Sequence, residues 1–88
     1  MIGGKAFYTA FRPNVISDAG ELYFFSEKPA EVHVEVFNAA GLPVGLSWEF
    51  DLENEMLLPV DAGALPRGLY FAVVRTGQGE SVLSFLRI

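Results

Sequence analysis

The segment Glu31-Val32-His33-Val34-Glu35-Val36 alternates polar and β-branched residues without interruption. Successive side chains of a β-strand point to opposite faces, so one face of this segment is apolar and the other is polar. We therefore expect the three valines to face a core and the polar residues to face water. The segment predicts a half-buried antiparallel strand.

Similar short runs occur on both sides of this segment. Residues 47–52 alternate polar and large apolar side chains, and four other runs are mostly apolar with β-branched or aromatic residues, which favours strands over buried helix. These runs are 7–11, 21–25, 69–74 and 82–86. Gly, Pro, Asn and Asp separate them, and every proline is expected at a strand end or in a loop. We expect one short helical turn, over residues 61–65.

This pattern predicts the fold class. About seven short strands with turn residues between them indicate an all-β, immunoglobulin-like antiparallel β-sandwich. The chain has 88 residues, of which 51% are hydrophobic and 19% charged, so disorder is excluded and one core is expected. We divide it into residues 1–10, a linker with a candidate first strand, and residues 11–88, a single sandwich domain.

Charge and cysteine content exclude several kinds of partner and site. The formal net charge is -5, so nucleic acid and anionic membrane surfaces would be repelled. No window approaches the roughly 18 apolar residues of a spanning helix, and the first residues lack the apolar region of a signal peptide. We therefore expect no bilayer insertion, no nucleic-acid partner and no leader. The absence of cysteine excludes disulfides and thiolate metal sites.

Two groups of side chains are candidates for a metal site, and we expect neither to hold one. His33 is the single histidine, and it lies between Glu31 and Glu35 on the polar face of its strand. Solvation and cross-strand pairing explain all three side chains. The acidic stretch 51–55 lacks the glycine and the spaced Asp/Asn pattern of a calcium loop.

No motif of an enzyme is present in the sequence. Carboxylates are numerous, but nothing marks two of them as lying in the pocket that glycoside hydrolysis needs. No G-x-S-x-G element and no phosphate-binding loop occurs. We expect a protein without catalytic residues, cofactor or metal.

Five aromatic residues leave a binding function open. They are Phe7, Phe11, Tyr23, Phe25 and Trp48. They could line a flat face that stacks on sugar rings, or they could fill the core of a small sandwich. Because both strand faces carry apolar residues, we expect some of them to be exposed as a contact surface.

Four sequence motifs, which we call landmarks, occur along the chain in the same order as in one protein family. Phe11-Arg12-Pro13-Asn14-Val15 opens the series, and an alternating strand with an Asn-x-x-Gly turn spans residues 32–44. Leu65-Pro66-Arg67-Gly68-Leu69-Tyr70-Phe71 follows, and residues 81–88 form the last strand. From residue 11 onward, the chain resembles the C-terminal sorting domain of the type IX secretion system. It is also similar to the immunoglobulin-like domain of the flagellar hook-capping protein.

The third landmark has a structural explanation that does not depend on the resemblance. Gly68 suits a corner that needs a positive φ or a close backbone approach, and Pro66 presets the turn. Tyr70 begins the next strand, where a buried ring with its hydroxyl on nearby backbone makes a tyrosine corner. The resemblance implies a structural role for seven landmark residues, which are Pro13, Asn14, Gly41, Leu65, Pro66, Gly68 and Tyr70.

The resemblance implies a folded address label without catalytic activity. In this family the domain directs a larger exported protein, an N-terminal passenger, across the outer membrane. The implied partners are the outer-membrane secretion machinery and a surface protease or transpeptidase. The implied location is the periplasm in transit, and then the cell surface or the medium.

The recognised surface is expected to include the terminal strand, through Leu83, Phe85, Leu86, Arg87 and Ile88. Alternation places Leu83, Phe85 and Arg87 on one face and Leu86 and Ile88 on the other. One set holds the core and the other is available for contact, and the sequence does not say which. An accessory carbohydrate-binding module or a structural spacer module of a secreted multidomain enzyme is the alternative.

Overall fold

Eight β-strands and no helix make up residues 7–88, the part of the chain that this computed structural model describes. The strands are β1 (Phe7–Arg12), β2 (Val15–Ile16), β3 (Ala19–Ser26), β4 (Ala30–Asn38), β5 (Pro43–Leu52), β6 (Glu55–Asp61), β7 (Gly68–Thr76) and β8 (Gly79–Arg87). Since β1 begins at Phe7, the sandwich already includes residues 7–10. The assignment of residues 1–6 to a linker lies outside the described residues.

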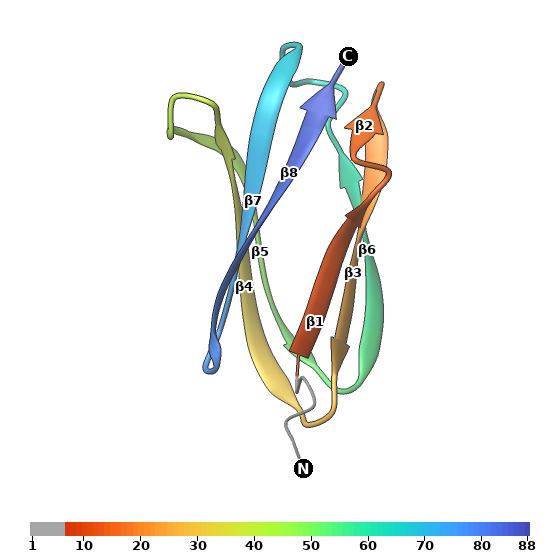
Figure 1. Ribbon diagram of the computed structural model, residues 1–88, viewed down its shortest axis with the longest axis vertical. Coiled ribbons are helices and arrows are strands. Elements are labelled where there is room, and N and C mark those ends of the chain that lie inside the picture. The colour runs from red at the N-terminus through yellow and green to blue at the C-terminus, as the bar shows by residue number, and fades with distance from the viewer. Residues whose placement is uncertain (1–6) are drawn as a thin grey trace.

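The strands form two sheets that face each other along the length of the molecule (Figure 1). One sheet has three strands in the order β1-β3-β6, and the other has five in the order β2-β8-β7-β4-β5. All pairings are antiparallel except that of β2 with β8, which is parallel. The predicted all-β sandwich is confirmed, with eight strands and one parallel pairing that the alternation patterns do not predict.

Inward-facing residues of both sheets form one hydrophobic core. Val32, Val34 and Val36 are each at most 2% exposed, as the alternation in β4 predicts. Phe24 of the three-stranded sheet packs edge to face against Phe50 of β5, with 5.2 Å between ring centroids. Because the chain has no disulfide, its stability rests on packing of this kind.

The strand β6 is not among the predicted strands. Met56, Leu58 and Val60 alternate toward the core, while Leu57 and Pro59 point outward. The expectation that every proline lies at a strand end or in a loop is wrong, because Pro59 lies inside β6. An edge strand pairs on one side only, which accommodates a residue without an N–H group.

The segment 61–65 forms a hydrogen-bonded turn, so the expected helical turn is wrong. The Leu65 N–H donates to the Ala62 carbonyl at 3.0 Å, and the Gly63 N–H donates to the Asp61 carboxylate at 2.9 Å. Asp61 thus closes an Asx turn that competes with helix formation. The side chain of Leu65 packs against the core.

A tyrosine corner joins this turn to β7. The Tyr70 hydroxyl donates to the Pro66 carbonyl at 2.5 Å, and its ring is 4% exposed and stacks on Phe85 of β8. Gly68 adopts a φ of +153°, a conformation that side-chain-bearing residues rarely take. The structural role expected for Pro66, Gly68 and Tyr70 therefore has a geometric basis.

Asn38 closes the turn between β4 and β5. Its side-chain oxygen accepts hydrogen bonds from the N–H groups of Ala40 and Leu42, each at 3.0 Å. Gly41 donates its N–H to the Asn38 carbonyl at 2.9 Å and has a φ of +85°, which favours glycine. The Asn-x-x-Gly landmark is a turn that satisfies its own backbone groups.

Truncation of the corner tyrosine tests this description of the fold. Tyr70→Ala removes a buried ring from between two strands, so we expect it to lower the free energy of unfolding by about 3–5 kcal/mol. Tyr70→Phe keeps the ring and removes the bond to Pro66, which predicts a loss of about 1 kcal/mol. Urea denaturation measures both values. A Tyr70→Ala midpoint equal to that of the unmodified chain would contradict the buried position.

Candidate functional site

The inner side of the terminal strand β8 holds the two sheets together. Phe85 is 1% exposed and stacks on Phe11 of β1, with 4.4 Å between ring centroids and 6° between ring planes. Leu83 packs against the same core. Arg87 donates hydrogen bonds to the carbonyls of Ala62, at 3.0 Å, and Gly63, at 3.1 Å. These three residues therefore have structural contacts inside the domain.

The outer side of β8 is apolar and exposed. Leu86 is 40% exposed and Ile88 is 56% exposed, and Val82 is also exposed. Leu86 lies beside Val15 of the parallel strand β2 on one side and beside Leu69 of β7 on the other. We call this group, Val15, Leu69, Val82, Leu86 and Ile88, the terminal-strand patch. Clustered exposed apolar residues of this kind mark contact surfaces.

Part of the outer edge of β8 carries no neighbouring strand. β2 pairs with Leu86 and Arg87, and its Ile16 carbonyl accepts from the Ile88 N–H at 2.9 Å. Directly before β2, the Asn14 carbonyl accepts from the Leu86 N–H at 2.8 Å. Asn14 follows Pro13, so the first landmark of the sequence leads directly to this pairing. Within residues 7–88, no strand is hydrogen-bonded to the outer edge of β8 from residue 79 to 85. Such an edge can accept a strand from a partner.

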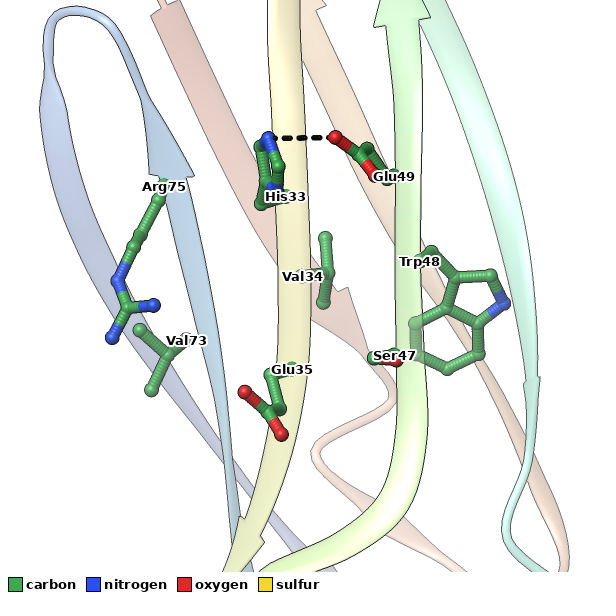
Figure 2. Close-up of a pocket in the computed structure, with 8 residues that line it drawn as sticks. All are labelled: His33, Val34, Glu35, Ser47, Trp48, Glu49, Val73 and Arg75. Carbon is green, nitrogen blue, oxygen red and sulfur yellow. Dashed lines mark ion pairs between the residues drawn. The ribbon is translucent and has the colours of Figure 1, made fainter.

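A row of charged side chains borders the patch on the same face. Arg75 of β7 forms an ion pair with Glu80 of β8 at 2.7 Å, and His33 of β4 lies beside Arg75 in register. Figure 2 shows His33 and Glu49 of β5 pointing toward each other, and their ion-pair distance is 3.1 Å. These groups are exposed, so solvent screens them and they contribute little to stability.

The hollow around His33 has a volume of about 400 Å³. Ser47 also lines it (Figure 2). The imidazole Nε2, which would accept a proton from a serine nucleophile, instead faces Glu49. Within residues 7–88, the imidazole in this hollow is therefore paired with a carboxylate.

His33 contacts Glu49 across the sheet rather than its own neighbours Glu31 and Glu35. In residues 7–88, no three His, Asp or Glu side chains are close enough together to hold a metal ion. The acidic stretch 51–55 runs from the end of β5 through the turn at Glu53 and Asn54 to the start of β6. There, the carboxylate of Glu55 accepts a hydrogen bond from Tyr23 at 2.6 Å.

The five aromatic residues of the sequence do not form one face. Phe11 is buried, and Phe7 and Trp48 pack against the core. Tyr23 and Phe25 point to the outer face of the three-stranded sheet. The prediction that apolar residues would be exposed on a strand face is confirmed by the terminal-strand patch and by Tyr8, which alternation in β1 also directs outward.

Tyr23 has a raised pKa because its hydroxyl donates to the Glu55 carboxylate, a bond that the phenolate cannot make. Partial desolvation and the negative charge of Glu55 act in the same direction, and the guanidinium of Arg12 opposes them. Arg12 lies over the Tyr23 ring, with 5.2 Å from its Cζ to the ring centroid. Tyr23 thus connects a cation and an anion on this outer face.

The chain matches no protein-family model and no curated protein sequence. Residues 7–88 include no helix that is both long and apolar enough to cross a membrane. Its function is therefore inferred from the geometry of its own two outer faces.

The Tyr23–Glu55 bond can be tested by titration. The raised pKa means that folding favours the neutral phenol, so the bond contributes stability below the ordinary tyrosine pKa of about 10. That contribution is lost as the pH rises through the higher pKa of the folded state. We expect Glu55→Gln to lower the pKa of Tyr23, measured by carbon-13 NMR of the phenol ring. An unchanged pKa would show that the carboxylate is not the cause.

Proposed function

We propose that this chain is a non-catalytic C-terminal sorting domain that directs a larger exported protein across the outer membrane through the type IX secretion system. The observation that carries the proposal is the terminal strand β8, which combines the exposed terminal-strand patch with an open edge from residue 79 to 85. A partner that adds a strand uses both features. Hydrogen bonds to the open backbone edge give affinity, and contacts with the exposed side chains give specificity.

The structural role of the sequence landmarks supports the proposal. The resemblance implies that they form a framework, and the contacts of Asn14, Gly41 and Tyr70 are all within the framework of the sandwich. Asn14, directly before β2, accepts a hydrogen bond from Leu86 of β8, and Tyr70 packs against the ring of Phe85 in β8. Asn14 and Tyr70 therefore both contact the terminal strand, while Gly41 closes the turn between β4 and β5.

The proposal includes specific partners and locations. The outer-membrane secretion machinery binds the terminal-strand patch, and the passenger domain lies N-terminal to the sandwich. A surface protease or transpeptidase then removes the domain. The protein is in the periplasm during transit and afterwards at the cell surface or in the medium.

A fusion experiment tests the proposal. Residues 1–88 are placed behind an exported reporter in a bacterium that has this secretion system, and we expect most of the reporter at the cell surface. The double variant Leu86→Ser, Ile88→Ser removes apolar contact area from the patch, and we expect it to leave most of the reporter in the periplasm. Surface proteolysis and cell fractionation measure the distribution.

Substitution is preferable to deletion of the last residues, because Arg87 clamps the turn at Ala62 and Gly63. The matched control is Leu57→Ser, which changes a leucine of similar exposure on the opposite sheet and is expected to leave export unchanged. Exposed substitutions change stability by about 0.5 kcal/mol or less, which thermal unfolding checks. If the intact fusion stays in the periplasm while folded, the proposal is wrong.

A further inference from the structure

The outer face of the three-stranded sheet carries side chains that the proposed function does not use. Register places Tyr23 of β3 between Ala10 of β1 and Leu57 of β6, with Tyr8 and Phe25 paired in the next row. Tyr8 is 51% exposed and Leu57 is 52% exposed. We call Tyr8, Arg12, Tyr23, Glu55 and Leu57 the aromatic face. It lies on the sheet opposite to the terminal-strand patch.

Contacts between three strands fix the geometry of this face. The Tyr23 hydroxyl is held by Glu55 at 2.6 Å, and the Arg12 guanidinium is held over the Tyr23 ring. The rings of Tyr8 and Tyr23 are 6.0 Å apart with a 59° angle between their planes. Because Arg12 covers the Tyr23 ring, the more exposed Tyr8 offers the open ring surface. Side chains anchored on strands in this way form a preorganised site.

A hollow of about 370 Å³ lies beside Tyr23, with Arg12, Glu55, Met56 and Leu57 around it. The hollow offers both a hydrogen-bond donor and an acceptor, since the Arg12 guanidinium only donates and the Glu55 carboxylate only accepts. Neither ion pair of residues 7–88 includes Arg12 or Glu55. One oxygen of Glu55 accepts from Tyr23, which leaves its second oxygen for a ligand.

These groups select for a neutral ligand rich in hydroxyl groups. A charged ligand would be attracted by one of Arg12 and Glu55 and repelled by the other. A hydroxyl group accepts from the guanidinium and donates to the carboxylate with a single oxygen atom. A peptide strand would pair with a sheet edge, whereas Tyr23, at the centre of this face, belongs to β3, which is paired with a strand on both sides.

We propose that the aromatic face binds a neutral saccharide. One ring of the saccharide packs on Tyr8, and the apolar C–H face of a neighbouring ring, which lies in the hollow, packs on the Leu57 side chain. Hydroxyl groups at its rim accept from Arg12 and donate to Glu55, while Tyr23 holds both charged groups in place. This site is independent of the export function, because its residues belong to the other sheet.

Titration of the isotope-labelled chain with three neutral hexasaccharides, cellohexaose, chitohexaose and mannohexaose, tests the proposal by amide NMR. We expect at least one of them to shift amide signals of β1, β3 and β6 while those of β4, β7 and β8 stay in place. Tyr8→Ala should weaken binding by about tenfold, the effect of losing one aromatic contact. Tyr23→Phe removes the hydroxyl and should weaken binding about threefold.

The matched control is His33→Ala, which removes an exposed ring from the opposite sheet and is expected to leave the saccharide affinity unchanged. The amide spectrum of each variant reports whether it is folded. The proposal is overturned if no hexasaccharide shifts the aromatic face, or if Tyr8→Ala binds as tightly as the unmodified chain. It is also overturned if the amide signals of the aromatic face shift with protein concentration alone. Such a shift would assign the face to contact with a second copy of the chain.

Discussion

The stack of Phe11, Phe85 and Tyr70 is the interaction on which the rest of the structure depends. Phe11 comes from the three-stranded sheet, whereas Phe85 and Tyr70 come from neighbouring strands of the five-stranded sheet. Phe85 lies between the other two rings, with centroid distances of 4.4 Å to Phe11 and 5.5 Å to Tyr70. One buried ring thus connects the first strand, the tyrosine corner and the terminal strand, without any disulfide.

This constraint decides which side of the terminal strand is free. Because side chains alternate along a strand, burying Phe85 directs Leu86 outward. The parallel pairing with β2 and the clamp of Arg87 on the turn at Ala62 hold that orientation up to the end of β8. The exposed apolar row is therefore a consequence of the aromatic stack. It remains exposed because all eight strands of residues 7–88 belong to the two facing sheets, which leaves no strand to cover the outer face of β8.

Much of the fold could be predicted from the sequence, because alternation and turn residues act locally. The strand around Val34 and the corner at Tyr70 have strong local patterns. β6 was not predicted because its outward residues Leu57 and Pro59 are apolar like its core residues, so the sequence shows no alternation of polar and apolar side chains there. Its strand conformation depends on pairing with β3. The aromatic face was only partly predictable, since contacts between Tyr23, Arg12 and Glu55 depend on a register across three strands.

Site-specific crosslinking tests the central claim, that the terminal-strand patch contacts the export machinery. A photoreactive residue is placed at Leu86 of the reporter fusion, and in a second fusion at Leu57 on the opposite sheet. The account predicts crosslinks from position 86, but not from position 57, to an outer-membrane component of the secretion system, identified by mass spectrometry. Equal crosslinking from both positions, or none from position 86 in cells that export the reporter, would contradict it.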